Sequence, residues 1–325
     1  MKVLITGAAG FIGGFLVKHC LETGSAVQGI DICEPESEWA RGSFEHCDIR
    51  DVGRLLELIG AFRPELIFHL AAQSYPTVSL ARPLETMDTN VGGTVNLFEC
   101  LRSLGIKPTV VVACSSAEYG PVADEDLPVR EDHALRPLHP YGVSKVAQDL
   151  LAAQYFENFG IPAIRIRIFK TSGPGKLGDV YSDLARRTVE IEMGIRPPTM
   201  YVGNVTTRRT IVDVRDLVQA LWLSAQHCSP GEVYNVGGDE IYSVQELIEL
   251  IRAQSTSRFD VEQRPELMRL SDEAIVAGDN TKFRNCCSWT PKIRINTTLS
   301  DTLDWWRNRL AASALPRQQQ ATARV

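Results

Sequence analysis

The chain lacks an apolar run long enough to cross a membrane, and its cysteines follow no metal-binding spacing. A transmembrane helix needs about 20 predominantly apolar residues, so we expect no membrane span. None of the eight cysteines forms a C-x-x-C pair, and no histidine lies near them at zinc-finger spacing. We therefore expect reduced thiols and no metal ion. The first residues run straight into a strand instead of a signal peptide, which favours a cytoplasmic protein.

The chain also has fewer basic than acidic residues. The chain has 34 Lys and Arg against 40 Asp and Glu, a net charge of −6. This balance argues against nucleic acid or an anionic membrane surface as the main partner. The length of 325 residues and the hydrophobic fraction of 44% are ordinary for a globular protein of one large domain or two intimate ones.

A glycine-rich turn follows the first apolar run. Gly7, Gly10 and Gly13 are spaced three apart, after a strand at residues 3–5 and at the start of a helix that also carries Phe11 and Ile12. Glycines allow a sharp turn, a close approach of the backbone to a diphosphate and tight packing of helix on strand. The helix N-terminus adds free N–H groups and partial positive charge. We predict a dinucleotide site here.

Two acidic residues refine the choice of dinucleotide. Asp31 lies 18 residues after Gly13, at the end of the second predicted strand. A carboxylate there accepts hydrogen bonds from both ribose hydroxyls and repels a 2′-phosphate, which favours NAD, with NADP still possible. Asp48, followed by Ile49, either reaches the adenine amino group or is an ordinary turn residue.

The first two-thirds of the chain alternates β-branched runs with amphipathic segments, a pattern typical of a parallel α/β sheet. We predict strands at 3–5, 26–30, 66–70, 109–114 and 163–169, and helices at 11–23, 90–104 and 140–160. The expected fold is α/β: a Rossmann-type doubly wound parallel sheet with a smaller interleaved C-terminal substrate lobe. The expected boundaries are 1–169 plus about 208–232 for the NAD-binding domain, about 170–207 and 233–310 for the lobe, and 311–325 for a flexible tail.

Tyr141 and Lys145 lie four residues apart and therefore on one helix face. A phenol has a pKa of about 10, too high for an efficient proton shuttle at neutral pH. We expect the neighbouring ammonium to lower the pKa of Tyr141. Such a pair suits proton transfer at an alcohol or ketone while a nicotinamide transfers hydride.

Several motifs occur together in a fixed order. They are Gly7-x-x-Gly10-x-x-Gly13, Asp31, His69-Leu70-Ala71-Ala72, Asn90, Ser115-Ser116-Ala117-Glu118-Tyr119-Gly120 and Tyr141-x-x-x-Lys145. From Met1 to Arg307 the chain resembles the extended short-chain dehydrogenase/reductase family of nucleotide-sugar enzymes. Within that family it is most similar to the branch of GDP-mannose 4,6-dehydratase and GDP-4-keto-6-deoxymannose reductase.

The resemblance implies roles for individual residues. Ser115 would bind the sugar C4 oxygen, Tyr141 would exchange its proton, and Lys145 would hold the nicotinamide ribose. Arg209 and Arg269 would grip the nucleotide diphosphate, although a surface salt bridge is as good a reading of Arg269. Further candidate residues are Leu70, Ala71, Ala72, Asp48 and Ile49 for the cofactor, and Ser74, Ser116, Ala117 and Lys170 for the substrate.

Two positions depart from the family pattern. Ala117 stands where dehydratases carry the Glu that removes the C5 proton, and Glu118 should face away because neighbours on an extended segment point to opposite sides. Dehydration is therefore disfavoured. Lys170 stands where the family usually has Asn, which indicates either a simple phosphate contact or a more anionic sugar, such as a uronic acid.

These observations favour an NAD(P)H-dependent reductase of the C4 ketone of a nucleotide-linked, preferably GDP-linked, 4-keto-6-deoxyhexose. The alternative is an NAD-dependent nucleotide-sugar 4-epimerase, which uses the same residues. A non-catalytic NAD-binding regulator is a remote third possibility. By likeness to the family we also expect a homodimer formed through residues 90–104 and 141–159.

Overall fold

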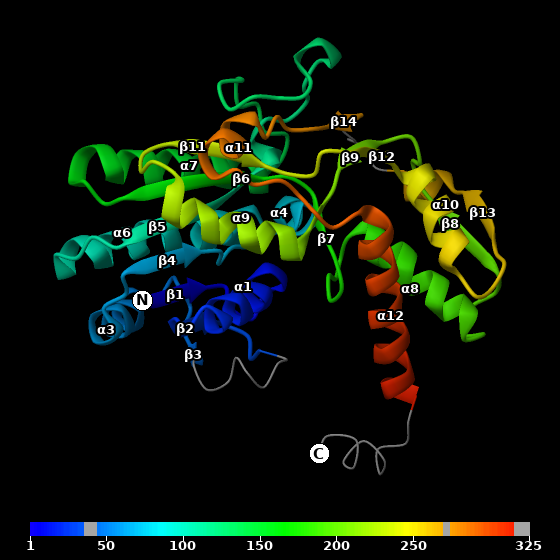
Figure 1. Ribbon diagram of the computed structural model, residues 1–325, viewed down its shortest axis with the longest axis horizontal. Helices are drawn as coiled ribbons and strands as arrows, with labels where there is room; N and C mark the ends of the chain where they lie inside the picture. Colours follow the sequence, from blue (N-terminus) through cyan, green and yellow to red (C-terminus); the bar gives the residue numbers. More distant parts are fainter. Residues whose placement is uncertain (36–43, 269–273, 315–325) are drawn as a thin grey trace.

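A seven-stranded sheet, parallel at every pairing, forms the centre of the protein (Figure 1). The computed structural model describes residues 1–35, 44–268 and 274–314. The strand order is β11-β6-β5-β4-β1-β2-β3. The strands are β1 (Lys2–Thr6), β2 (Ala26–Asp31), β3 (Phe44–His46), β4 (Leu66–His69), β5 (Thr109–Ser115), β6 (Ala163–Ile168) and β11 (Val233–Val236). The order reverses between β1 and β4, and ligands of such sheets bind outside the carboxyl ends of the strands at that point.

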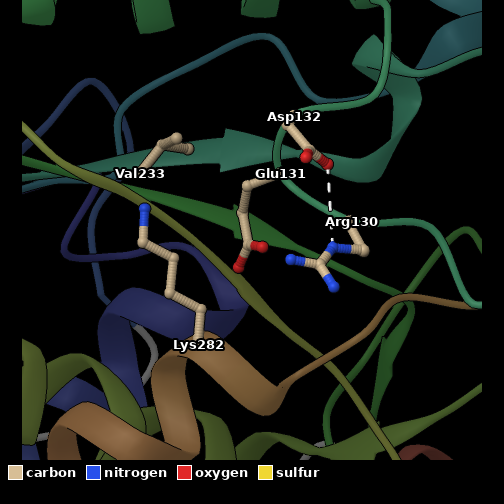
Figure 2. A pocket seen from close by; sticks show the side chains of 5 residues that line it. All are labelled: Arg130, Glu131, Asp132, Val233 and Lys282. Carbon is tan, nitrogen blue, oxygen red and sulfur yellow. Dashed lines mark ion pairs between the residues drawn. The ribbon is translucent and has the colours of Figure 1, made fainter.

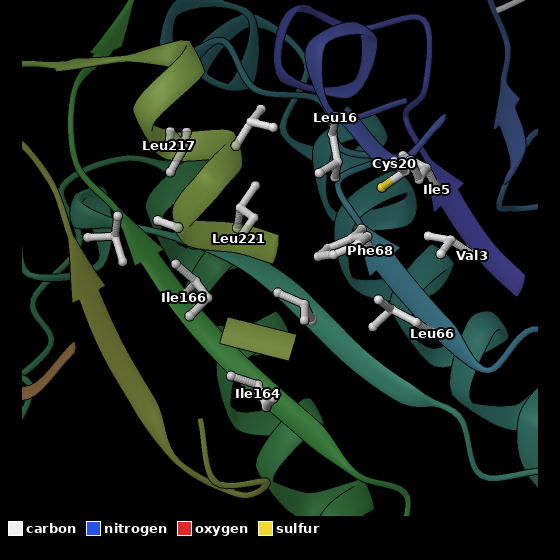
Figure 3. Packing of buried hydrophobic residues seen from close by; sticks show 14 of the residues in the cluster. Val3, Ile5, Leu16, Cys20, Leu66, Phe68, Ile164, Ile166, Leu217 and Leu221 are labelled. Atoms are coloured by element: carbon white, nitrogen blue, oxygen red, sulfur yellow. The ribbon is translucent and has the colours of Figure 1, made fainter. Parts of the chain in front are cut away.

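Helices cover both faces of this sheet (Figure 1). On one face lie α1 (Phe11–Glu22), α9 (Val214–His227) and α11 (Thr281–Cys287); on the other lie α3 (Val52–Phe62), α6 (Gly93–Leu104) and α7 (Pro140–Phe159). Successive residues of a strand alternate between faces. Val3 and Ile5 accordingly join the first core, shown in Figure 3, whereas Leu4 joins the second. The predicted doubly wound parallel sheet is confirmed.

The predicted helix at 90–104 is preceded by shorter helical turns. These are α4 (Pro76–Ala81), α5 (Pro83–Met87) and a π-helical segment, η1 (Asp88–Gly92), that runs directly into α6. Gly105 and Gly160 end α6 and α7 in the left-handed conformation, with φ of 61° and 62°. Glycine adopts this conformation without steric cost, so it marks helix ends that can be read from sequence.

A second group of elements packs around a separate core. It contains α8 (Val180–Glu192), α10 (Val244–Gln254) and α12 (Ile295–Ala314), with Val189, Leu247 and Leu303 buried between them. Strands β8 (Thr199–Val202) and β13 (Asp260–Gln263) pair in parallel. Three short strands form another sheet, in the order β12 (Ile241–Ser243), β9 (Arg208–Thr210), β14 (Ile275–Val276). The remaining pair is β7 (Thr171–Ser172) with β10 (Val212–Asp213).

Three elements lie at the predicted domain boundaries, which stay a prediction. Val233–Val236, assigned to the lobe, pairs with β6 at the edge of the central sheet. Arg208–Thr210, assigned to the NAD-binding domain, pairs with β12 and β14 instead. The sequence pattern indicates that a segment forms a strand. Which sheet the strand joins depends on the backbone N–H and C=O groups that lie next to it in the folded chain. Helix α12 also continues to Ala314, past the predicted start of the tail, whose residues 315–325 lie outside the described part.

Among the described residues, no helix is both long and apolar enough to cross a bilayer.

Candidate active site

The glycine turn between β1 and α1 leaves no room for side chains at two of its positions. Gly7 has φ of +75°, and a Cβ there would lie 2.8 Å from the backbone nitrogen of Ala71. A Cβ on Gly13 would lie 2.0 Å from the carbonyl oxygen of Gly7. The turn is thus held against the end of β4 by contacts that only glycine permits.

Gly10 is the N-cap of α1, and within the described residues no side chain caps the N-terminal N–H groups of this helix. Phe11 and Ile12 form its first turn. Uncapped N–H groups with the helix dipole behind them suit an anionic group such as a dinucleotide diphosphate. The turn therefore fits the predicted cofactor.

Asp31 ends β2 and faces this turn. Its Oδ2 accepts a hydrogen bond from the N–H of Ala9 at 3.0 Å, and its Oδ1 accepts one from Cys33 at 3.1 Å. Asp48 lies near the same edge, but its carboxylate is bound to Arg50, with Nη2 2.6 Å from Oδ2. The hydrogen bonds from Arg50 hold the pKa of Asp48 below its usual value. The side chain of Ile49 is buried against Gly93.

The segment after β4 is fixed to the turn by polar contacts. Leu70 donates its N–H to the carbonyl oxygen of Thr6 at 3.2 Å, and Ala71 donates to Thr6 Oγ1 at 3.1 Å. His69, fully buried, contacts Thr6 through Nδ1 and Thr94 through Nε2. Burial lowers the pKa of His69 to about 3, so this imidazole is neutral and serves to position the segment, which continues through half-buried Ala72.

Asn90 joins this segment to α7. Its Oδ1 accepts from the N–H of Gln73 at 2.7 Å, and its Nδ2 donates to Gln73 O and to Ser144 Oγ, at 3.0 and 2.8 Å. The helix that carries Tyr141 and Lys145 is thereby held in register with the end of β4. Ser74, two residues after Ala72, is exposed.

The structure brings Ser115, Tyr141 and Lys145 together at the carboxyl end of β5. Lys145 donates its ammonium to the carbonyl oxygen of Ala113 at 2.8 Å, and its Nζ lies 5.9 Å from the centroid of the Tyr141 ring. Ser115 lies close enough to Tyr141 to oppose part of the rise in the pKa of the phenol. His139, the N-cap of α7, stacks on the Tyr141 ring at 5.9 Å between centroids, a contact that the sequence analysis missed.

The expected lowering of the pKa of Tyr141 is wrong for this structure. Burial raises the pKa of Tyr141 to about 12, and neighbouring Ser115 offsets this only in part. Burial also lowers the pKa of Lys145. Spacing along a helix shows that Tyr141 and Lys145 are neighbours. It does not show how far each side chain is removed from water, and this desolvation disfavours both the phenolate and the ammonium.

Glu118 belongs to a buried polar network that the sequence analysis also missed. Residues Ser116–Glu118 form a 3₁₀ turn instead of the expected extended segment. Glu118 is fully buried and its Oε1 accepts from the N–H of Ser115 at 2.7 Å. Its Oε2 lies 3.2 Å from Nε of Arg167, whose Nε also donates to Oδ2 of Asp149 at 2.9 Å. The signal available in the sequence was two arginines, Arg165 and Arg167, inside an apolar strand.

Burial and the neighbouring carboxylate of Asp149 raise the pKa of Glu118 to about 8. Within the described residues Oε2 of Glu118 has no hydrogen-bond partner, although Nε of Arg167 lies 3.2 Å away. Glu118 therefore points into the interior and acts on the site through the backbone of Ser115. Neighbouring Ser116 and Ala117 are half-buried, and the Ala117 carbonyl packs against Gly142 at the start of α7.

The predicted substrate residues lie on several segments. Lys170 is half-buried and forms an ion pair with Asp179 at 3.2 Å. Lys176, which the sequence analysis did not select, lies over the ring of Phe11 with Nζ 4.9 Å from the centroid, and burial lowers its pKa. Arg209 lies on β9 and donates to the carbonyl oxygen of Arg208 at 2.8 Å. Arg269 lies outside the described residues.

Two cavities of about 280 and 270 Å³ open elsewhere, beside β11. Figure 2 shows the first, which Lys282 and Glu131 line and where Arg130 pairs with Asp132. Lys282 is also bound to Glu232 at 2.7 Å. Because Lys282 and Arg130 are already engaged in ion pairs, neither cavity competes with the site around Tyr141.

The fold and this site define a Rossmann-type protein of the short-chain dehydrogenase/reductase class. Residues 4–302 match the family model of GDP-mannose 4,6 dehydratase, and the chain belongs to this family, within the extended short-chain dehydrogenases/reductases. The predicted family is confirmed.

Two relatives and one solved structure are similar along nearly their whole length. GDP-6-deoxy-D-mannose reductase of Pseudomonas aeruginosa is 28% identical and covers 95% of this chain and 98% of its own. UDP-glucose 4-epimerase of Mycolicibacterium smegmatis is 31% identical, and the match covers 95% of this chain and 99% of the epimerase. The structure of RMD from Pseudomonas aeruginosa complexed with NADPH superposes with a TM-score of 0.84, at 27% identity, over 95% of this chain and 99% of that one.

Proposed function

We propose that this nucleotide-sugar enzyme reduces the C4 ketone of a GDP-linked 4-keto-6-deoxyhexose with NADH or NADPH. One observation carries the proposal: Ser115, Tyr141 and Lys145 meet at the carboxyl edge of the sheet, where the dinucleotide turn also lies, while no carboxylate stands at position 117 and Glu118 is turned into the interior. The site thus has the groups for proton transfer at an alcohol or ketone and lacks a base at the position that dehydration uses.

Three residues would act in the transfer of hydride and proton: Ser115, Tyr141 and Lys145. A bound reduced nicotinamide supplies the hydride. Tyr141 donates its hydroxyl proton to the oxygen that becomes the C4 alcohol, and its high pKa keeps that proton in place until the oxygen becomes more basic. Ser115 donates a hydrogen bond to the same oxygen. Lys145 is held by Ala113 and stabilises the negative charge that Tyr141 acquires.

For the cofactor, the turn of Gly7, Gly10 and Gly13 holds the diphosphate with Phe11 and Ile12, and Asp31 accepts the ribose hydroxyls. Leu70, Ala71 and Ala72 line the opposite side. The hydrogen bond from Ala9 fixes one oxygen of Asp31 at the turn and supports a preference for NAD, because a 2′-phosphate would meet a carboxylate. Asp48 contacts the adenine only if its bonds to Arg50 rearrange, and buried Ile49 contributes through its backbone.

For the substrate, Ser74, Ser116 and Ala117 lie along the sugar, and Lys170, Arg209 and Arg269 bind its anionic groups. Support for a GDP-sugar comes from the matching family model and from the reductase relative. Lys170 and Lys176 place two ammonium groups on one loop, which supports a phosphate contact and leaves a uronic acid as the competing ligand.

A 4-epimerase is the second candidate, supported by the epimerase relative at 31% identity. It would oxidise C4 and reduce it from the other face with the same three residues. A non-catalytic NAD-binding regulator is disfavoured because the whole proton-transfer group is present.

One experiment separates these functions. The purified protein is incubated with GDP-4-keto-6-deoxymannose and NADH or NADPH, and loss of the reduced cofactor is followed by absorbance. A reductase consumes one cofactor per sugar, and Tyr141→Phe slows this consumption strongly. Interconversion of UDP-glucose and UDP-galactose without added cofactor assigns the epimerase. Bound NAD with neither reaction assigns the regulator.

We also propose a homodimer formed through α6 and α7. Val143 and Leu150 are exposed apolar residues seven positions apart on α7, and therefore lie on one face. Light scattering after size exclusion measures the mass: a dimer that Leu150→Glu converts to a monomer supports the interface, and a monomeric wild type contradicts it.

A further inference from the structure

Three cysteine side chains converge where the C-terminal ends of two helices meet. Cys228 is the C-cap residue of α9, and Cys286 and Cys287 end α11. The three Sγ atoms all lie within 4.8 Å of one another, and those of Cys228 and Cys287 are 3.5 Å apart. These two residues are 59 positions apart in the chain, so the fold assembles the group.

The spacing of the sulfur atoms suits a shared metal ion better than a disulfide. A Zn–S bond is about 2.3 Å long, so three sulfurs around a tetrahedral ion lie about 3.8 Å apart. The distance of 3.5 Å between Cys228 and Cys287 is within a few tenths of an ångström of that value. A disulfide requires about 2.05 Å between sulfurs, so the thiols of Cys228 and Cys287 are not bonded to each other in this arrangement.

The group is also reachable and only weakly engaged. Cys228 is buried, whereas Cys286 and Cys287 are half-buried. Cys286 Sγ donates to the carbonyl oxygen of His227 at 3.1 Å, and Cys287 Sγ donates to that of Leu223 at 3.9 Å. Thiols are weak donors, so these contacts do not compete seriously with a metal–thiolate bond.

We propose that Cys228, Cys286 and Cys287 form a binding site for one soft, thiophilic cation of the Zn²⁺ or Cu⁺ type. Thiolate ligands select such ions. Each cysteine that binds releases its thiol proton to solvent and no electron is transferred. Three protein ligands leave one tetrahedral position for water. The site is independent of the proposed enzymatic function.

The position of the site indicates a structural role. Helix α9 packs on the central sheet against α1, and α11 returns to that sheet directly after β14 of the three-stranded sheet. Asn280 lies just before α11. Its Oδ1 accepts from the N–H of Gly237 at 2.9 Å, and its Nδ2 donates to the carbonyl oxygen of Gly237 at 3.0 Å. A bound ion joins α9 to α11 and thereby holds the returning segment in place.

The test uses the full chain, reduced and freed of metal with a chelator. Cd²⁺ is added as the probe because its bonds to thiolates absorb in the ultraviolet, and native mass spectrometry counts the bound ions. Zn²⁺ is then added as a competitor. We expect one Cd²⁺ per chain, displacement by Zn²⁺, release of protons, and a higher melting temperature of the loaded protein.

Matched variants locate the site. Cys286→Ser or Cys287→Ser should weaken Cd²⁺ binding at least tenfold, and the triple replacement of Cys228, Cys286 and Cys287 by Ser should abolish it. Cys33→Ser, which removes an exposed lone thiol, should leave binding unchanged. The half-buried position of Cys286 makes its single variant the least disruptive, and its melting temperature without metal verifies the fold.

Two results would overturn the proposal. One is thiolate–Cd²⁺ absorption of equal intensity in the wild type and in the triple variant. The other is failure of the reduced wild type to bind Cd²⁺ or Zn²⁺ stoichiometrically.

Discussion

Replacement of Glu118 by Gln should remove a pH dependence from the stability of this protein. Glu118 is fully buried, and burial beside Asp149 raises its pKa from 4.5 to about 8 in the folded chain. Gln has a similar shape and does not titrate. Its amide oxygen can still accept from the N–H of Ser115.

The sign and size of the effect follow from proton linkage. Because the folded-state pKa is raised, the folded chain holds a proton that the unfolded chain releases above pH 4.5. The contribution to stability is fully present below pH 4.5 and is lost as the pH rises through about 8. One pKa unit corresponds to about 1.4 kcal/mol, so the loss across this window is on the order of 2–5 kcal/mol. This pKa of about 8 already includes the opposing effect of Arg167, 3.2 Å from Glu118, which stabilises the ionised carboxylate.

The assay is urea unfolding at about pH 5 and about pH 8. We expect the wild type to lose stability between the two values relative to Glu118→Gln, so that the variant becomes the more stable protein at the higher pH. Glu57→Gln, at an exposed carboxylate on α3, is the control and should follow the wild type. If Glu118→Gln and the wild type lose stability in parallel, Glu118 does not hold the buried proton and our reading of the network is wrong.

Three further outcomes are expected. Tyr141→Phe should lower turnover by a factor of about 10² to 10⁴ without lowering the melting temperature, since it removes only the transferable proton; retained turnover in a steady-state assay would contradict the proposed role. Gly13→Ala should lower the free energy of unfolding in urea by about 2 kcal/mol or more and abolish NAD binding, because its Cβ would lie 2.0 Å from the Gly7 oxygen. The control Gly14→Ala has open space at its Cβ and should raise the free energy of unfolding by about 0.5 kcal/mol. Asp31→Ala should reduce the preference for NADH over NADPH at least tenfold in kcat/KM, and unchanged selectivity would remove Asp31 from the ribose site.

Patterns of residues close in the sequence predicted much of the fold. Alternation of apolar runs predicted the strands from β1 to β6 apart from the three-residue β3, and Gly105 and Gly160 marked the ends of α6 and α7. The glycines of the dinucleotide turn were predicted for the steric reasons that the structure displays. Each of these features depends on contacts between residues close in sequence, or on a backbone conformation that one residue type permits.

Other features escaped because their cause is remote in sequence. Glu118 was expected to face away from the site on an extended segment; it does face away, but on a 3₁₀ turn that places it 3.2 Å from Arg167 of β6. The pKa of Tyr141 was expected to fall, yet burial raises it. Desolvation depends on the whole surrounding structure and not on the identity of one neighbour.

The amino-acid order by itself determined that this chain forms a parallel α/β sheet, that a glycine turn opens it, and that a tyrosine and a lysine share one helix face, since steric limits and helical periodicity act over a few residues. Only the tertiary structure decided that β11 closes the edge of that sheet, that a carboxyl group keeps its proton behind Ser115, and that three cysteines from two helices meet. Packing brings distant segments together and strips water from their polar groups, and neither effect is written in the spacing of residues along the chain.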